Sequence, residues 1–250
     1  MSDDPRAPDA GSRVRRLHRA SGAIALATFV VVHVLVQASA LGGQSRYDAI
    51  AGPLARMAVA PIVEALFVLA PLAIHVGCGL YLFRRGSNAL DDERYPSRRL
   101  WVVQRASAAF ALVFVVSHAW ELRIQRLFLG LAPDGLYSTM AANLSSTAVG
   151  VPWRALFYVL GIAAIAIHLA NGLHAGAAKL EPPARRRVRI ATVALGLGIF
   201  VVGSATVIGL ATGTRLLPGA DDDSGRQAPP PCGSAVKQAP LKAPPQASFR

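Results

Sequence analysis

Residues 61–83 read PIVEALFVLAPLAIHVGCGLYLF, an apolar run interrupted only by Glu64 and His75. An α-helix needs about 20 such residues to cross a hydrocarbon core of about 30 Å. Four further runs of this kind lie at residues 20–41, 102–122, 154–177 and 188–212. No cleavage signature of small residues follows the first run, so we expect it to remain as a span and not to be removed as a signal peptide. The sequence therefore predicts an all-α integral membrane protein, a bundle of five helices.

The basic charge of the chain is distributed unevenly between the two sides of this bundle. The chain carries 26 Lys and Arg residues and a formal net charge of +12. Of the 26, 16 lie in the N-terminal segment and the loops after the second and fourth spans, five lie in the opposite loops, and five lie in the C-terminal tail. The positive-inside rule then predicts a cytoplasmic N-terminus and an external C-terminus. The same rule accounts for the positive net charge of the chain. Nucleic-acid binding is not indicated, because the sequence has no basic patch interleaved with aromatic residues.

Four of the six histidines occupy four different spans, one in each: His33, His75, His118 and His168. An ionisable side chain within a membrane span is costly and by default marks a functional site. A single histidine in a span could instead hydrogen-bond a neighbouring helix. The depth of each histidine in the bundle helps to separate these interpretations.

Two of the four histidines lie at one depth. His33 follows the basic residue Arg19 by 14 positions. In the third span, which runs in the same direction, His118 follows Arg105 by 13 positions. At a rise of about 1.5 Å per residue, both histidines lie roughly 20 Å from the cytoplasmic edge.

The other two histidines lie at a second depth. His75 precedes Arg84 by 9 positions, and His168 precedes Lys179 by 11. Both therefore lie roughly 14–16 Å from the same edge. Two histidines at one level on different helices can ligate a flat metal macrocycle from both faces, so two such pairs predict two haems. The haems are expected to be b-type, because the chain has no C-x-x-C-H attachment motif, and no carboxylate or thiolate cluster favours zinc.

Several polar residues near the cytoplasmic edge have two interpretations each. Trp101 and Lys179 occupy the positions of interfacial anchors, but they could also hydrogen-bond haem propionates. Ser21, Gln104 and Arg105 have the same two interpretations.

The two remaining histidines are not expected to be ligands. His18 lies at the cytoplasmic edge, so we expect it to be solvated or at the level of the lipid headgroups. His174 follows His168 by six positions, about 240° around the helix, and faces elsewhere. Four glycines within the spans would permit the close approach of a flat ring or another helix: Gly22, Gly79, Gly161 and Gly172.

Glu64 is the other ionisable group of the second span. It precedes His75 by 11 residues, about three helical turns, so the two share a face toward the bundle interior. An unpaired carboxylate there is costly, so we expect it to be protonated or hydrogen-bonded. Two interpretations stay equal: a proton-handling group near an outer quinone site, or a buried acid that satisfies a neighbouring helix. Pro71 removes a helical hydrogen bond and should kink this span.

The sequence predicts three regions. Residues 1–12 are expected to be a disordered N-terminus, and residues 13–212 the five-span haem-binding domain. Residues 213–250 are rich in Pro, Ala, Gly and Asp and cannot bury enough apolar surface to fold. We therefore expect a disordered tail that haem binding does not need.

Three spans carry motifs of one known family. The second span has Glu64, then Pro71-Leu72-Ala73-Ile74-His75, then Gly79 and Tyr81, similar to a Glu, Pro-Leu-x-x-His, Gly-x-Tyr pattern. The third has Gln104-Arg105 and His118-Ala119-Trp120, similar to Gln-Arg … His-x-Trp, and the fourth has His168-Leu169-Ala170-Asn171-Gly172, similar to His-x-x-Asn-Gly. With a looser match in the first span, the chain resembles the five-helix, dihaem cytochrome b membrane anchor of succinate:quinone oxidoreductases and fumarate reductases.

This resemblance implies a role in electron transfer within a bacterial cytoplasmic membrane. A flavoprotein subunit and an iron–sulfur subunit would bind on the cytoplasmic side, and a membrane quinone, in this family usually menaquinone, would accept the electrons. No dicarboxylate active site is expected on this chain. The implied haem contacts are His75 and His168 for the inner haem, His33 and His118 for the outer haem, and Trp101 and Lys179 for the inner propionates.

One position departs from part of the family. Ala166 stands where some dihaem fumarate reductases carry a Glu in a transmembrane proton path, which puts such a path in doubt here.

Two alternative functions stay open. The cytochrome b subunit of a nitrate reductase, hydrogenase or formate dehydrogenase would also bind two haems. A transporter or structural membrane protein would use the histidines as polar interior contacts and would be colourless.

Overall fold

The computed structural model describes residues 10–85, 97–125, 128, 135–178 and 180–218 of the chain. Within these ranges the regular structure is helical, apart from one isolated antiparallel bridge between Ala148 and Val151. Five of the described helices are long and apolar enough, by length and composition, to cross a membrane. The predicted all-α class with five spans is therefore confirmed.

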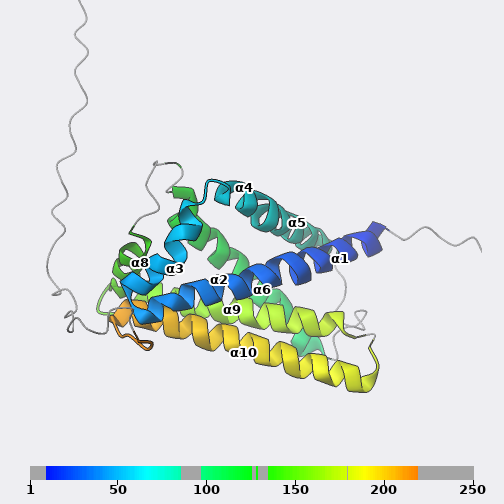
Figure 1. Ribbon diagram of the computed structural model, residues 1–250. Helices are drawn as coiled ribbons and strands as arrows, with labels where there is room; N and C mark the ends of the chain where they lie inside the picture. The colour runs from blue at the N-terminus through cyan, green and yellow to red at the C-terminus, as the bar shows by residue number, and fades with distance from the viewer. Residues whose placement is uncertain (1–9, 86–96, 126–127, 129–134, 179, 219–250) are drawn as a thin grey trace, which may run out of the picture. The chain divides into compact units, whose positions relative to one another are not determined.

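Each span is a continuous helix (Figure 1), and three of the spans include a π-helical turn, labelled η. The first span consists of α1 (Ala10–Ala20), η1 (Ser21–Leu26), α2 (Ala27–Gln37) and the 3₁₀ turn η2 (Ala38–Gly42). The second consists of α4 (Ala60–Glu64), η3 (Ala65–Leu69) and α5 (Ala70–Arg84). The third consists of α6 (Arg98–Ala119) and η4 (Trp120–Ile124), the fourth is α9 (Trp153–Gly176), and the fifth is α10 (Pro182–Thr212).

Several helices extend beyond the apolar runs from which they were predicted. α1 begins at Ala10, so it includes residues 10–12 of the segment expected to be disordered. Arginine is a good helix former, so main-chain hydrogen bonding continues through the basic flanks of the spans. α10 begins with Pro182, a favourable residue in the first turn, and ends before Gly213, whose φ of 73° is a usual helix stop.

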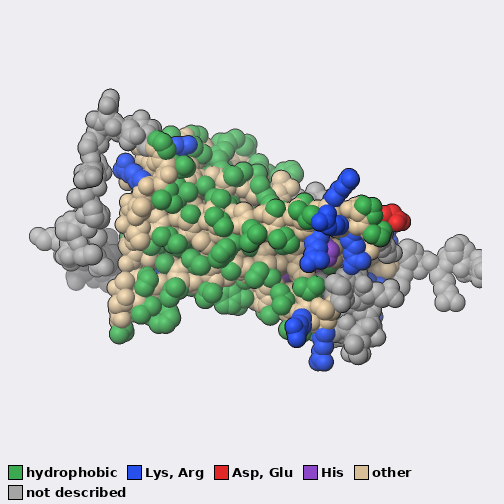
Figure 2. Space-filling model, turned by 90° about the horizontal axis from the view of Figure 1, so that it is seen from below, with side chains coloured by type: hydrophobic (Ala, Val, Ile, Leu, Met, Phe, Trp, Pro, Cys, Tyr) green, Lys and Arg blue, Asp and Glu red, His purple; other side chains and the backbone are tan. Residues whose placement is uncertain are grey.

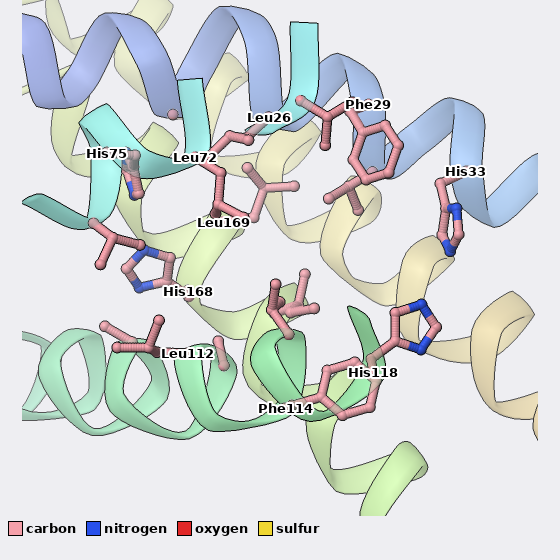
Figure 3. Close-up of a pocket in the computed structure, with 18 of the residues that line it drawn as sticks. Leu26, Phe29, His33, Leu72, His75, Leu112, Phe114, His118, His168 and Leu169 are labelled. Carbon is pink, nitrogen blue, oxygen red and sulfur yellow. The ribbon is translucent and has the colours of Figure 1, made fainter. Parts of the chain in front are cut away.

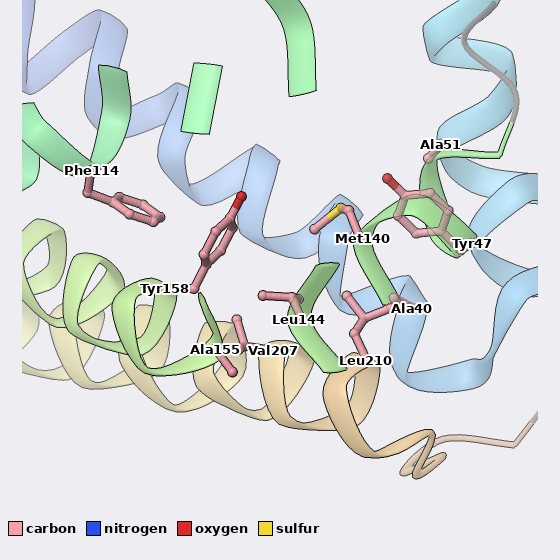
Figure 4. Close-up of a cluster of buried hydrophobic side chains, with 10 residues drawn as sticks. All are labelled: Ala40, Tyr47, Ala51, Phe114, Met140, Leu144, Ala155, Tyr158, Val207 and Leu210. Carbon is pink, nitrogen blue, oxygen red and sulfur yellow. The ribbon is translucent and has the colours of Figure 1, made fainter. Parts of the chain in front are cut away.

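Two further helices were not predicted. α3 (Gln44–Arg56) and α8 (Leu136–Ser145) lie in connections that the sequence indicated only as loops. Both pack at the end of the bundle where α10 ends, which we call the far end (Figure 1). Figure 4 shows the buried core that joins them to the spans. Its members are Ala40, Tyr47, Ala51, Phe114, Met140, Leu144, Ala155, Tyr158, Val207 and Leu210.

The opposite end of the bundle is rich in arginine, and we call it the basic end. Figure 2 shows Lys and Arg side chains gathered there. They come from the start of α1, the end of α5 and the starts of α6 and α10, and include Arg15, Arg16, Arg19, Arg84, Arg85, Arg98, Arg99, Arg105, Arg185, Arg186, Arg187 and Arg189. The charge asymmetry in the sequence thus becomes an asymmetry between the two ends of the bundle.

The second span is packed differently from the others. α9 packs against α6 and α10, whereas α5 packs mainly against α1 and η1. No residue of α4, η3 or α5 is buried, although the span is as apolar as its neighbours. The inward side chains of the second span therefore face a space that the protein itself does not fill.

Candidate functional site

A cavity of about 1960 Å³ lies among the spans and is lined by residues from all five of them. Pockets for one small ligand usually measure about 300–1,000 Å³, so this volume is sufficient for two large groups. The lining between its two ends is apolar and includes Leu26, Leu72, Leu112 and Leu169 (Figure 3). Such a lining excludes water and suits a flat hydrophobic group.

The four histidines of the spans all line this cavity, and they lie in two facing pairs (Figure 3). His75 on α5 faces His168 on α9, with 6.1 Å between ring centroids and 82° between ring planes. His33 on α2 faces His118 on α6, with 5.8 Å between centroids and 84° between planes. We call them the basic-end pair and the far-end pair. These are the two pairs that the spacing in the sequence predicts.

Both pairs have the spacing of two imidazoles that share one metal ion. A metal ion bonded to one nitrogen of each ring, at about 2 Å per bond and from opposite sides, holds the ring centroids about 6 Å apart. Within the described residues, no group of three or more His, Cys, Asp or Glu side chains is arranged to hold a metal. The donors therefore fit two axial positions of a macrocycle better than a tetrahedral ion site.

The second ring nitrogen of each basic-end histidine is held by a neighbouring helix. Nδ1 of His75 lies 2.9 Å from the carbonyl oxygen of His18, to which it can donate. Nδ1 of His168 lies 3.3 Å from the carbonyl oxygen of Gln104 and 3.0 Å from the Gln104 amide nitrogen. A ligand histidine commonly donates its second N–H to a carbonyl, which fixes the tautomer and leaves Nε2 for the metal.

The far-end pair has different surroundings. Nδ1 of His118 is buried and has no hydrogen-bond partner among the described residues. The His118 ring packs against the rings of Phe114 and Tyr158, each at 5.6 Å between centroids. A buried nitrogen without a partner is costly, so this atom calls for a group or a water from outside the described protein.

The cavity is cationic where it approaches the basic end. The Trp101 ring lies 4.1 Å from the guanidinium carbon of Arg105, which also lies 5.0 Å from the Phe83 ring. Both Trp101 and Arg105 line the cavity, together with Arg15, Arg19 and Arg85. This arrangement suits a carboxylate group. Lys179, the other residue expected to contact propionates, lies outside the described residues.

Glu64, which was expected to be protonated or hydrogen-bonded on an inward face, has a charged partner and is partly exposed. Its carboxylate forms an ion pair with Arg123, 2.6 Å between Oε2 and Nη2, and its side chain is 43% exposed. The pair links the start of the second span to the end of the third, because η4 continues the third helix past the predicted limit at residue 122. Both residues line the cavity at the far end.

One curated relative was found for this chain. The succinate dehydrogenase cytochrome b558 subunit of Bacillus subtilis (strain 168) is 28% identical over 159 residues, which make up 64% of this chain and 75% of the relative. The chain is similar to a succinate dehydrogenase cytochrome b subunit. The resemblance that the motifs predicted is therefore confirmed. No protein-family model matches the chain, and no solved structure matches it at a significant level.

Two groups near the histidines were misjudged or missed. His18, expected to be solvated or at headgroup level, is half-buried, and its ring stacks on His75 with 4.0 Å between centroids. Tyr158, which is 7% exposed, donates its hydroxyl hydrogen to Glu121 at 3.2 Å, and Arg154 lies 3.8 Å from the same carboxylate. The sequence held one signal for Glu121, which follows His118 by three residues and so lies on the same helix face.

Each of the four glycines that the sequence singled out faces a side chain of another span. A β-carbon on Gly22 would lie 2.5 Å from Cε1 of His75, and one on Gly79 would lie 3.2 Å from Cε1 of His18. A β-carbon on Gly161 would overlap the Phe114 ring, and one on Gly172 would lie 3.2 Å from the Gln104 amide nitrogen. The missing side chains thus make room for the histidines and for the residues that hold them.

Proposed function

We propose that this chain is the membrane anchor and electron-transfer subunit of a succinate:quinone oxidoreductase and that it binds two b-type haems. One observation carries the proposal: four histidines from four spans meet in one apolar cavity as two facing pairs, with 6.1 Å and 5.8 Å between ring centroids. The similarity to a succinate dehydrogenase cytochrome b558 subunit supports it independently.

In this proposal the two histidine pairs are the axial ligands. His75 and His168 hold the haem nearer the basic end, and His33 and His118 hold the other. Haem, when bound, supplies a one-electron carrier at each pair. The leucines between the pairs keep water out of the cavity, and the hydrogen bonds to Nδ1 of His75 and of His168 tune the basicity of the ligand nitrogen in each ring.

At the basic end, Trp101 and the arginines of the cavity mouth would bind the propionates of the nearer haem. The stacking of Arg105 on Trp101 holds its guanidinium in a fixed position, which favours carboxylate binding because less side-chain freedom is lost. Lys179 is assigned the same role on the motif resemblance alone.

We place the basic end in the cytoplasm of a bacterium, because arginine and lysine are enriched on the cytoplasmic side of membrane proteins. The N-terminus is then cytoplasmic and the C-terminus external. An iron–sulfur subunit, carrying electrons from a flavoprotein subunit that oxidises succinate, would dock on this end. This chain itself would have no dicarboxylate site.

At the far end, a quinone such as menaquinone would take up electrons and protons. Glu64 lines the cavity there and remains partly exposed, so it could exchange protons with solvent. Arg123 would keep the carboxylate in position between proton transfers.

The proposal is tested by purifying the tagged full chain from its native membranes. We expect a flavoprotein and an iron–sulfur protein to co-purify, succinate to reduce a b-type spectrum, and a quinone to reoxidise it. Recovery with a molybdenum or nickel enzyme would instead favour the cytochrome b of another respiratory oxidoreductase. A colourless preparation would exclude haem binding altogether.

A further inference from the structure

His18 holds His75 through contacts that no other histidine of the described residues makes. The ring of His18 lies parallel to that of His75, with 14° between planes and 4.0 Å between centroids. Nδ1 of His18 lies 2.9 Å from the carbonyl oxygen of His75, and Nδ1 of His75 lies 2.9 Å from the carbonyl oxygen of His18. Each histidine can therefore donate to the backbone of the other, which ties α1 to α5 at one point.

Two glycines allow this interlocked arrangement. Gly22, four residues after His18, leaves the space that the His75 ring occupies, and Gly79, four residues after His75, leaves the space that the His18 ring occupies. The pattern is reciprocal along both helices, since residues four apart share a helix face. The sequence of both spans thus accommodates two stacked rings, and not His75 alone.

These contacts fix the direction of the ligand nitrogen. With Nδ1 of His75 anchored on the His18 carbonyl, Nε2 is the nitrogen left for a metal, and the His75 ring faces His168 (Figure 3). Stacking against His18 limits rotation of the His75 plane, which stands at 82° to the plane of His168. At the far end the rings of Phe114 and Phe29 pack on His118 and His33, but among the described residues Nδ1 of His118 has no hydrogen-bond partner.

We propose that His18 is a positioning residue: its side chain sets the ring orientation of His75 and thereby the redox potential of the haem at the basic end alone. This inference rests on the proposed function. Groups that hold the second nitrogen of a metal-bound histidine raise its basicity and are needed for full affinity. The acceptor for Nδ1 of His75 is the main-chain carbonyl of residue 18, and the His18 side chain keeps this carbonyl in place through its own hydrogen bond to the His75 carbonyl. Loss of the side-chain bond should loosen the anchor on Nδ1, lower the basicity of Nε2, favour ferrous over ferric iron, and raise the midpoint potential.

The test uses the full chain in its purified complex and three variants. His18→Phe keeps a stacked ring but removes the donor, and His18→Ala removes both. His174→Phe is the matched control, since His174 is also a histidine of the basic end but does not line the cavity. The measurements are haem per polypeptide, potentiometric titration of the two haem components, and the low-spin ferric electron paramagnetic resonance signals. A His168→Ala variant identifies the basic-end component.

We expect His18→Phe to raise the midpoint potential of the basic-end component and to change its low-spin signal, whose anisotropy depends on the angle between the imidazole planes. His18→Ala should alter that signal more strongly or lose that haem, and the far-end component should stay as in the parent in both variants. His174→Phe should change neither component. Unaltered spectra and potentials in both His18 variants, or equal changes or losses in both haems, would overturn the inference. A parent complex without haem would instead overturn the proposed function.

Discussion

His75 and His118 show how differently two candidate ligands are held in one cavity. Nδ1 of His75 has a main-chain acceptor on another helix, whereas Nδ1 of His118 has no partner among the described residues. Two haems held in this way would have different surroundings and different potentials. Substitutions should therefore separate them.

The first prediction concerns the pairing. His33→Ala and His118→Ala should each alter the same haem component, because the two rings face each other at 5.8 Å. His75→Ala and His168→Ala should each alter the other one, because their rings face at 6.1 Å. Redox titration of membranes from the four variants checks this. The pairing is wrong if the His33 and His75 variants share one altered component.

The second prediction concerns Glu64. Glu64→Gln should slow quinone reduction, since an amide cannot carry the proton, and should leave both haems bound, because an exposed ion pair contributes little to stability. The charge-swapped double variant Glu64→Arg with Arg123→Glu tests the alternative interpretation. We expect it to remain slow. Recovery of the parent rate would mean that the ion pair acts only as a contact between helices.

The side-chain partners at this scale could be predicted only in part from the sequence. The fixed rise of a helix predicts which histidines share a level, because each pair is counted along helices of one direction. It does not put the two pairs on one depth scale, since His18, next to the edge residue Arg19, stacks on His75. The ion pair of Glu64 depends on how far the third helix continues past its apolar run, and the stacking of His18 depends on how closely α1 approaches α5. Both are matters of tertiary packing, which hydrophobicity does not specify.

At the scale of helices, the spans could be predicted because their apolar runs are as long as a hydrocarbon core requires. α3 and α8 could not, since they are short and their buried residues, such as Tyr47 and Leu144, are covered only when α3 meets η2 and α8, and α8 meets α10. The kink expected at Pro71 falls next to the π-helical turn η3, which ends at Leu69. η1 begins three residues after His18, and η4 begins two residues after His118. Turns of this kind are frequent at functional sites.

The third prediction concerns the packing of α9 on α6. Gly161→Ala should destabilise the protein by about 1–3 kcal/mol, because its β-carbon would overlap the Phe114 ring in a packed core. Gly198→Ala on α10 is the control: its β-carbon would meet nothing within 4 Å, so we expect a gain of about 0.5–1 kcal/mol from helix propensity. Thermal unfolding in detergent measures both. Equal unfolding temperatures would contradict the packing described for α9.

For the molecule as a whole, the basic end and the far end differ in composition and packing. Arg15, Arg19, Arg85, Arg105 and Trp101 line the cavity toward the basic end, whereas α3, α8 and the first residues after α10 pack together and close the bundle at the far end. Residues 214–218 belong to this closure. The N–H groups of Leu216 and Leu217 donate to the carbonyl oxygen of Leu41 at 2.9 and 3.1 Å, and Arg46 donates to the carbonyl oxygen of Pro218 at 3.0 Å.

The fourth prediction follows from these bonds. Truncation after Pro218 should leave haem content and quinone reduction as in the full chain. Truncation after Gly213 should lower the thermal stability of the far end, because it removes three hydrogen bonds to η2 and α3. Comparison of the two truncations by haem content and unfolding temperature checks this. Loss of haem in the truncation after Pro218 would show that residues 219–250 are required.

The most direct test of the whole account is the amount of haem per polypeptide in the purified complex, measured together with a redox titration. Two facing histidine pairs in one cavity predict two non-covalent b-type haems per chain, with low-spin, bis-histidine spectra and two resolved redox components. One haem, no haem, or a high-spin spectrum at either site would contradict the claim that both pairs are ligands.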